Sequence, residues 1–385
     1  MRIAVVSNLL PPEGKGGAEA YAALVASTLA ESHEVLVLSG SAEGDVAAPV
    51  AALPALAELA DDAAVAKKLV WHARDQWRPT VHAAVAKQLR EFDPDVVHTH
   101  AVQGLSAAVF TAISRSGVPH VHTAHDLSLI CARTSMTRDR HFCGGECASC
   151  RVQRAVRGSA FKRHITTLLA VSDYIRRRHM EYGVVDPDNA TVLRLGSSAR
   201  ELRPRRVPDD RSLHLGFLGK LAPNKGILTL IDMFRDAPSS WQLTIAGTGP
   251  LTGRVEAAAR DIPNVRYLGH VSGDVKEAFF DEIDVLAIPS EWEEPAALVG
   301  TEAAARGVPL LVSDRGGLPE LPEARVFAAC SVESLRATAD WFTEVPDRIS
   351  EISKRLITRH DEFSWVTHMA KLESHLAAAA ATAAP

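Results

Sequence analysis

The segment Ser290–Gly307, which reads SEWEEPAALVGTEAAARG, carries the most specific chemistry in this sequence. An acidic loop is expected to lead into a helix that begins near Pro295 and Ala296, because proline suits the first turn of a helix. Glu294 then lies at the mouth of the helix and Glu302 two turns further along. A carboxylate accepts hydrogen bonds from two neighbouring hydroxyls, so the pair suits a polyhydroxylated ligand. The alternative for Glu302 is an exposed helical residue.

Two further features of the same half of the chain suit an anion. The first N–H groups of a helix have no partner within it and carry a partial positive charge. Those of Ala296, Ala297 and Leu298 are expected to point toward a ligand. Lys220 and Lys225 flank a proline-containing loop in GKLAPNKG, and two ammonium groups at this spacing can neutralise one pyrophosphate. The alternative is a pair of solvated lysines.

The first half of the chain offers a glycine loop and a histidine. Gly16 and Gly17 stand in PPEGKGGAE between a strand and a helix, where backbone N–H groups can approach an anion. A plain strand-to-helix turn is the alternative. His125 stands near the end of VHTAHDL, at the carboxyl end of an expected strand, where ligand-binding residues of α/β sheets gather. The chain has 16 histidines, and the rival candidates are His98, His100, His120 and His122.

Four of the five cysteines lie close together in the sequence. Cys131, Cys143, Cys147 and Cys150 form a C-x11-C-x3-C-x2-C pattern, and four thiolates can close a tetrahedral zinc site. A structural zinc ion would hold a segment that is otherwise long, polar and without a core. A loop with a disulfide or free thiols and an iron–sulfur cluster are the alternatives, and His141 can replace one ligand.

Length and composition indicate a globular protein of roughly two to three domains. The chain has 385 residues, of which 46% are hydrophobic and 23% charged. Its 42 basic and 47 acidic residues give a net charge of −5, which argues against a nucleic-acid partner. No run of about 18 apolar residues predicts a membrane span, and the N-terminal segment lacks the pattern of a signal peptide. We therefore expect a cytoplasmic location.

Alternating strands and helices predict an α/β architecture with two doubly wound parallel sheets. In the first half, the expected strands are Arg2–Ser7, His33–Ser39, Val96–His100, Pro119–Ala124, Leu168–Ser172 and Thr191–Leu195. Gly44–Arg90 is expected to be helical, and the polar stretch Gly196–Arg211 has the composition of a linker. The later strands are expected at Leu213–Leu218, Gln242–Ala246, Val265–Leu268, Asp284–Pro289 and Leu310–Ser313. Two such Rossmann-like halves predict a ligand cleft at the carboxyl ends of the strands.

The joint pattern of these motifs resembles the family 4 glycosyltransferases, retaining enzymes of the GT-B fold. The resemblance runs nearly end to end, through GGAE, VHTAHD, LLAVSDYIR, GFLGKLAPNKG, TIAGTGP, VRYLGHVS and EPAALVGTEAAARGVPLLVSDRGGLPE. It implies an acceptor-side N-terminal domain over residues 1–198, on which a helix at 363–385 packs back. It also implies a nucleotide-sugar-binding domain over residues 199–362 and a Cys-rich insertion at 131–150, which we expect in the acceptor-side wall.

The resemblance implies roles for the candidate residues at the donor. Gly16 and Gly17 match the loop that faces the donor phosphate, and Lys220 and Lys225 match the basic pair at the diphosphate. The family usually has Arg at the position of Lys220, so bidentate phosphate contact is lost there. The remaining donor-binding residues that it implies are His270 and Val271 at the base, Glu294 at the sugar, Ala296, Ala297 and Leu298 through their backbone, and Glu302 at the ribose hydroxyls. Ala296 and Ala297 replace the usual Phe-Gly, which changes the shape of the sugar pocket.

The implied reaction is retaining transfer of a sugar from a UDP- or GDP-sugar to an acceptor hydroxyl. His125, Glu294 and Lys225 are the implied catalytic residues. No DxD-like motif stands at a strand end, so no catalytic divalent metal is expected. The product is expected to be a natural-product or cell-envelope glycoside, made from a small-molecule or glycan acceptor.

Other functions stay open at this point. They are a GT-B pseudo-glycosyltransferase, a nucleotide-sugar epimerase and a non-catalytic sugar-binding protein. A dinucleotide-dependent oxidoreductase is disfavoured because no GxGxxG with a following acidic residue is present. Membrane association is not indicated, and the sequence specifies neither the sugar, base and acceptor nor the oligomeric state.

Overall fold

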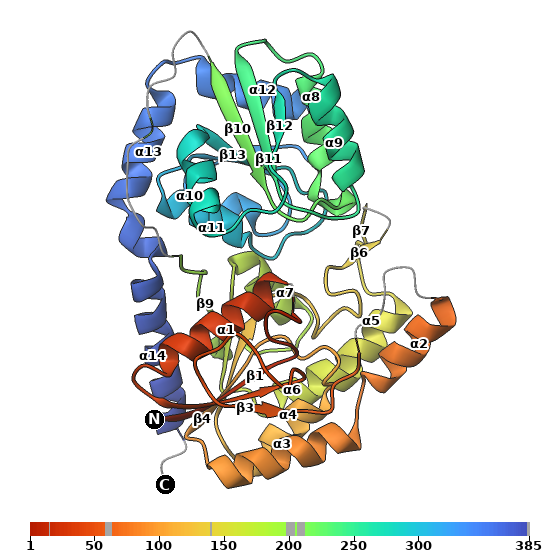
Figure 1. The fold of residues 1–385 in the computed structure, drawn as a ribbon. Helices are drawn as coiled ribbons and strands as arrows, with labels where there is room; N and C mark the ends of the chain where they lie inside the picture. Colours follow the sequence, from red (N-terminus) through yellow and green to blue (C-terminus); the bar gives the residue numbers. More distant parts are fainter. Residues whose placement is uncertain (15, 58–63, 139–140, 198–204, 206–211, 383–385) are drawn as a thin grey trace. The chain divides into compact units, whose positions relative to one another are not determined.

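The computed structural model describes residues 1–14, 16–57, 64–138, 141–197, 205 and 212–382 (Figure 1). The chain divides into two compact units. The first comprises Met1–Met136, Cys143–Arg194 and Met369–Pro385, and the second comprises Thr137–Phe142 and Leu195–His368. Each unit is built around its own parallel sheet.

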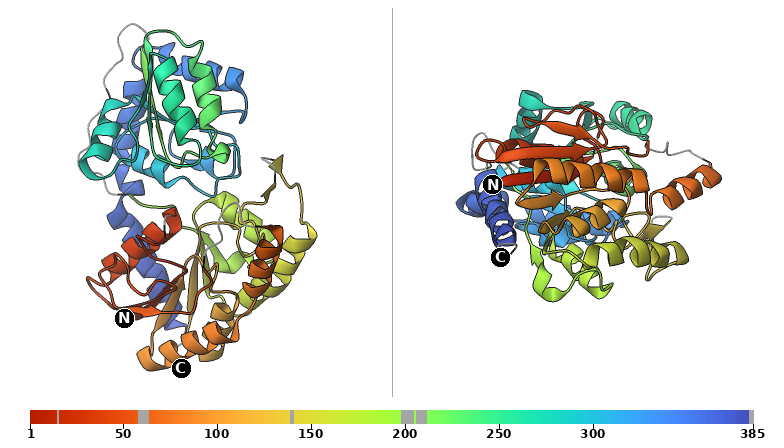
Figure 2. Two further views of the ribbon diagram at one scale, coloured as in Figure 1. Left: turned by 45° about the vertical axis from the view of Figure 1, so that its right-hand side comes forward. Right: turned by 90° about the horizontal axis from the view of Figure 1, so that it is seen from below.

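The sheet of the first unit has seven parallel strands in the order β3-β2-β1-β4-β5-β8-β9. Its strands are β1 (Arg2–Ser7), β2 (Glu34–Ser39), β3 (Val50–Ala52), β4 (Val96–Thr99), β5 (His120–Ala124), β8 (Thr167–Ala170) and β9 (Ala190–Val192). The central strands are buried along their length, since helices cover both faces of a parallel sheet. The helix α1 (Gly17–Leu29) lies on one face, and α4 (Ala108–Ser116) and α6 (Ser159–Lys162) lie on the other (Figure 2).

The expectation that Gly44–Arg90 is helical is wrong in its first part, because β3 lies there. This strand is three residues long, sits at the sheet edge and is only partly buried, and its alanines favour a helix over a strand. Further helices of the unit are α2 (Val65–Arg74), α3 (Pro79–Phe92), α5 (Ala148–Gln153) and α7 (Asp173–Glu181). A π-helical turn at Arg154–Gly158 joins α5 to α6. The short strands β6 (Thr137–Arg138) and β7 (His141–Phe142) pair antiparallel.

The sheet of the second unit has six parallel strands in the order β12-β11-β10-β13-β14-β15. These are β10 (Leu213–Leu218), β11 (Trp241–Ala246), β12 (Val265–Tyr267), β13 (Val285–Ile288), β14 (Leu310–Ser313) and β15 (Ala324–Phe327). The helices α8 (Ile227–Phe234) and α9 (Thr252–Asp261) lie on one side of this sheet, and α10 (Gly273–Glu282) and α11 (Leu298–Ala305) lie on the other (Figure 1). The chain continues with α12 (Val332–Thr343), α13 (Arg348–Thr358) and α14 (Trp365–Ala381).

The predicted linker Gly196–Arg211 lies mostly outside the described residues, but two of its positions are informative. Ser197 forms a parallel bridge with Ser364, supported by a hydrogen bond from the Trp365 N–H to the Ser197 carbonyl at 2.9 Å. Arg205 is buried and donates to the carbonyl of Phe280 at 2.6 Å. Ser197 and Arg205 thus pack within the second unit. In the part of the chain that the structure describes, no helix has the length and apolar character needed to cross a membrane.

Candidate active site

Lys225 and Glu294 come from the two loops at the switch point of the second sheet. The strand order reverses between β10 and β13, and the loops that follow these strands carry Lys225 and Glu294. The Lys225 Nζ donates to Glu294 Oε1 at 2.5 Å and lies 4.9 Å from the centre of the Trp292 ring. The Ser290 hydroxyl donates to the same carboxylate oxygen at 2.8 Å. The Glu294 side chain is 6% exposed and that of Lys225 is 27% exposed, so the ion pair is largely shielded from water.

Two glycines let these loops pack against their neighbours. Gly226 and Gly316 have positive φ angles of 68° and 58°, which side chains rarely permit. A Cβ atom on Gly226 would overlap the Pro289 carbonyl, and one on Gly316 would overlap the backbone of Glu294. The Gly317 N–H donates to the Glu294 carbonyl at 2.7 Å. The backbone around Glu294 is therefore held from both sides.

Gly226→Ala is expected to lower the free energy of unfolding by at least about 2 kcal/mol, because it adds both a strained φ and a backbone clash. Gly253→Ala is the matched control, since Gly253 lies in α9 with no neighbour near its Cβ position. That substitution is expected to be neutral or stabilising by up to about 1 kcal/mol. Urea denaturation of both variants measures the difference, and equal stabilities would contradict the packing described.

The other predicted donor residues of the second unit lie in different environments. Glu302, on α11, accepts a hydrogen bond from Lys276 of α10 at 2.8 Å, and this ion pair fixes its carboxylate. Lys220 and His270 are exposed, whereas Val271 is buried. Helix α11 begins at Leu298, so the prediction that it starts near Ala296 is wrong by about one half-turn.

The reason for this later start lies in the backbone of Ala297. Its φ and ψ of −108° and 105° are extended, and no side chain caps the helix. The early N–H groups of α11 are therefore not satisfied by a capping side chain, as an anion-binding helix start requires.

In the first unit, His125 is paired with a second histidine. His125 Nε2 lies 3.0 Å from His100 Nδ1, and the two rings stack at 5.3 Å. Tyr21 of α1 packs edge-on against His125 at 5.0 Å. His100 is fully buried and follows β4, whereas His125 is half-buried and follows β5. The sequence did not single out His100 as a partner of His125; it stood among the rival candidates.

The other histidines of this sheet have structural partners. His120 and His122 both hydrogen-bond the Thr99 hydroxyl, at 2.7 and 2.8 Å, and His98 hydrogen-bonds the Thr123 hydroxyl at 2.8 Å. Burial lowers the pKa of His120 to about 3 and places the pKa of His122 and of His100 well below 6.5. His100, His120 and His122 are therefore neutral at pH 7, and His120 and His122 link β5 to β4 through the Thr99 hydroxyl.

Acidification is expected to destabilise the protein through these histidines. The unfolded chain takes up a proton near pH 6.5, while folded His120 does so only near pH 3, so stability falls as the pH drops through this interval. For His120 alone the loss at pH 5 is about 2 kcal/mol. Urea denaturation at pH 7 and pH 5 measures it, and His120→Gln is expected to flatten the dependence. An unchanged pH dependence in that variant would contradict the assignment.

In the first unit, the Glu19 carboxylate lies against Gly16 of the glycine loop. Gly16 precedes α1, and a Cβ atom on Gly16 would overlap the Glu19 carboxylate. The Asn8 amide donates to Glu19 Oε1 at 3.1 Å and holds it there. Gly17 has open space around its Cβ position. A phosphate that approached Gly16 would therefore meet the negative charge of Glu19.

The chain matches two known protein families. Residues 15–197 match the family described as Glycosyltransferase Family 4, and residues 212–342 match the family described as Glycosyl transferases group 1. The chain belongs to the family 4 glycosyltransferases. Between them the two matches span most of both units.

Relatives of this glycosyltransferase include a glycogen synthase and a mannosyltransferase. Glycogen synthase of Mycobacterium tuberculosis is 28% identical over 349 residues, which are 83% of this chain and 80% of that protein. A GDP-mannose-dependent alpha-mannosyltransferase of Mycolicibacterium smegmatis is 29% identical over 244 residues, 60% of this chain and 59% of that protein. The structure of Anabaena Alr3699/HepE in complex with UDP has a TM-score of 0.72 at 17% identity and covers 98% of this chain and 100% of that one. The predicted GT-B fold is confirmed.

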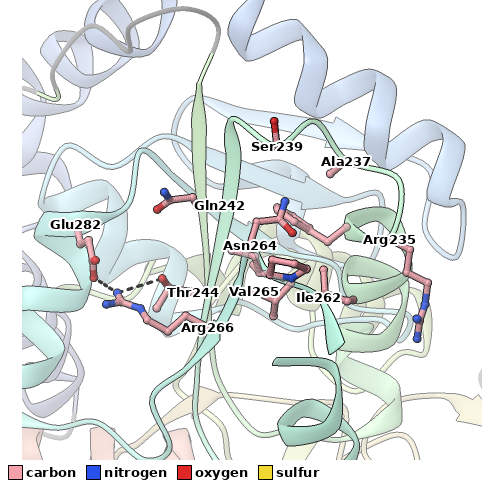
Figure 3. Close-up of a pocket in the computed structure, with 13 residues that line it drawn as sticks. Arg235, Ala237, Ser239, Gln242, Thr244, Ile262, Asn264, Val265, Arg266 and Glu282 are labelled. Atoms are coloured by element: carbon pink, nitrogen blue, oxygen red, sulfur yellow. Dashed lines mark hydrogen bonds and ion pairs between the residues drawn. The ribbon is translucent and has the colours of Figure 1, made fainter. Parts of the chain in front are cut away.

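A cavity of about 590 Å³ in the second unit of the glycosyltransferase contains none of the predicted site residues (Figure 3). It is lined by residues of β11 and β12 and the segments before them, among them Gln242, Asn264 and Arg266. Arg266 pairs with Glu282 and donates to the Thr244 hydroxyl at 3.3 Å. Gln242 and Asn264 lie at the amino ends of their strands, whereas Lys225 and Glu294 follow carboxyl ends. The cavity is therefore separate from the switch point.

The predicted zinc site is not supported by this structure of the glycosyltransferase. All five cysteines lie among the described residues, and none forms a disulfide. No group of three or more His, Cys, Asp or Glu side chains in the described ranges is arranged to hold a metal ion. Cys131 and Cys150 are buried, whereas Cys143 and Cys147 are exposed.

Two of these cysteines differ in acidity. A hydrogen bond with the Ser149 hydroxyl, together with hydrogen bonds from Cys150, lowers the pKa of Cys147 to about 7. Burial raises the pKa of the Cys150 thiol. Cys147 is thus the more acidic thiol of the pair.

Proposed function

We propose that this glycosyltransferase transfers a sugar from a UDP- or GDP-sugar to an acceptor hydroxyl with retention of the anomeric configuration. The observation that carries the proposal is the Lys225–Glu294 pair at the switch point of the second sheet, since ligands of doubly wound sheets bind there. The Anabaena protein is in complex with UDP, and the mycolicibacterial relative is GDP-mannose-dependent. Both nucleotides are therefore candidates.

The donor diphosphate would be stabilised by lysines and backbone groups. As the bond to the sugar breaks, negative charge grows on the diphosphate, and preorganised donors lower the barrier. Lys225 is placed for this role by Glu294, while exposed Lys220 adds a weaker point charge. The N–H groups of Ala296, Ala297 and Leu298 would face the same phosphate. No catalytic divalent metal takes part in this proposal.

Carboxylates would hold the hydroxyl groups of the donor. Glu294 would accept hydrogen bonds from the sugar, because a carboxylate can accept from neighbouring hydroxyls while it keeps its contacts to Lys225 and Ser290. Glu302, fixed by Lys276, would accept from the ribose. His270 and Val271 would border the base. Gly16 and Gly17 would approach the donor phosphate only with a movement of Glu19.

His125 would orient the sugar and the acceptor from the first unit. In the front-face substitution that we propose, the leaving phosphate takes the proton of the acceptor hydroxyl, so no carboxylate nucleophile is needed. His100 holds His125 through the 3.0 Å contact between their ring nitrogens, and Tyr21 limits its rotation. The product would be a natural-product or cell-envelope glycoside.

His125→Ala is expected to lower kcat by about 10²-fold, because a positioned hydrogen-bonding group is lost at the reacting centre. The Kd of the nucleoside diphosphate is expected to change by less than about twofold, since the diphosphate is held by the other unit. Steady-state kinetics measure kcat, and calorimetric titration measures the Kd of the nucleoside diphosphate. A rise in Kd that accounts for the whole loss would contradict the role of His125.

The reaction itself is tested by product analysis. The protein is incubated with a panel of UDP- and GDP-sugars and hydroxylated acceptors, and nucleoside diphosphate release is followed. Proton NMR of the product then gives its anomeric configuration. Retention in an acceptor glycoside supports the proposal, whereas an inverted glycoside, or an epimerised nucleotide sugar without transfer, would overturn it.

A further inference from the structure

Cys147 and Cys150 stand as a C-x-x-C pair outside the site described above. Cys147 precedes α5 and Cys150 lies in its first turn. Their Sγ atoms are 3.5 Å apart, and a disulfide would require them to close to about 2.05 Å. Thus only a small movement of the two side chains separates the thiol pair from a bonded pair.

The two thiols differ in access to solvent. Cys147 is exposed, with its Sγ 3.0 Å from the Ser149 hydroxyl, so an external disulfide can reach its sulfur. Cys150 is only 3% exposed and sits beside Cys131, which is 2% exposed. An exposed attacking thiol backed by a buried second thiol is the arrangement of a disulfide-exchange pair.

We propose that Cys147 and Cys150 form a reactive dithiol that is oxidised to an intramolecular disulfide by exchange with a low-molecular-weight disulfide. The Cys147 thiolate attacks the external disulfide, forms a mixed disulfide and releases one thiolate. Cys150 then attacks the Cys147 sulfur, gives up its proton and releases the second thiol. One dithiol and one external disulfide thus give one protein disulfide and two small thiols, so that atoms and electrons balance.

The pair is connected to the segment that follows His125. Gln153, at the end of α5, donates to the Ser128 carbonyl at 2.7 Å, and the Ser128 N–H donates to Asp126 at 2.8 Å. Two hydrogen bonds thus connect α5 to Asp126, the residue next to His125. The chemistry of the pair itself does not depend on the proposed transferase reaction.

The test uses the reduced full-length protein and glutathione disulfide as the probe. After alkylation and digestion, mass spectrometry is expected to find a peptide pair joined through Cys147 and Cys150, and dithiothreitol is expected to reverse the bond. In Cys150→Ser the mixed disulfide has no resolving thiol, so glutathione is expected to stay on Cys147. The rate of glutathionylation of Cys147 is expected to exceed that of exposed Cys143 by about tenfold or more. In Cys147→Ser, buried Cys150 is expected to stay unmodified.

The wild-type cross-link gives a result that does not depend on whether the serine variants fold. A bond between Cys131 and Cys150, or equal reactivity of Cys147 and Cys143, would overturn the proposal. So would zinc that copurifies at about one ion per chain and blocks oxidation until it is chelated, since the thiols would then be metal ligands.

Discussion

Lys225→Met is expected to lower kcat/KM for the nucleotide-sugar donor by about 10²–10³-fold, because a preorganised cation at the leaving diphosphate is lost. Its ammonium already lies in a partly shielded site, 2.5 Å from Glu294 Oε1 and over the Trp292 ring. Shielding from water strengthens the attraction between this charge and a phosphate. Steady-state kinetics with the preferred donor measure the effect.

The controls separate the loss of charge from a loss of stability. Methionine leaves the buried Glu294 carboxylate without its cation, which is expected to cost roughly 1–3 kcal/mol of folding free energy. The double variant Lys225→Met with Glu294→Gln removes both charges and is expected to recover stability without recovering activity. Lys220→Met removes an exposed charge and is expected to cost only about tenfold in kcat/KM. If both lysine variants lost the same activity, the special role of Lys225 would be refuted.

Glu294→Gln is expected to lower kcat by about 10²-fold, because one acceptor oxygen at the donor sugar becomes an NH₂ donor. The glutamine oxygen can still accept from Lys225 and Ser290, so the loop is expected to keep its conformation. Kinetics with a constant acceptor, together with the melting temperature, distinguish a catalytic loss from unfolding.

Glu293→Gln is the matched control for this variant, since it makes the same chemical change one residue away. Glu293 accepts from the Gly316 N–H at 2.9 Å, which a glutamine oxygen can also do. Its kcat is expected to stay within about threefold of the wild type. Equal losses in the two variants would mean that the loop, rather than the Glu294 carboxylate, carries the activity.

The central strands could be predicted from the sequence because burial on both faces produces continuous apolar runs. For example, β1, β10 and β14 begin and end at the predicted residues. The edge strand β3 escaped prediction because it is short and partly exposed. The start of α11 was misplaced because Pro295 favours a first helical turn, but the extended backbone at Ala297 delays it.

The meeting of Lys225 and Glu294 could be anticipated from strand order, since both follow strands on either side of the switch point. The residues that hold the site residues in place could not be predicted from the sequence. Lys276 reaches Glu302 from another helix, 26 residues away in sequence, and nothing in the local pattern marks it. The cysteine spacing suggested four equivalent ligands, but burial divides them into inner and outer pairs, and that depends on packing.

The most direct measurement of the central claim is a crystal structure of the protein with a bound nucleoside diphosphate. The account predicts a diphosphate within hydrogen-bond distance of Lys225 Nζ, with a ribose hydroxyl on the Glu302 carboxylate. A nucleotide bound instead in the cavity beside Arg266, with Lys225 still paired only to Glu294, would contradict it.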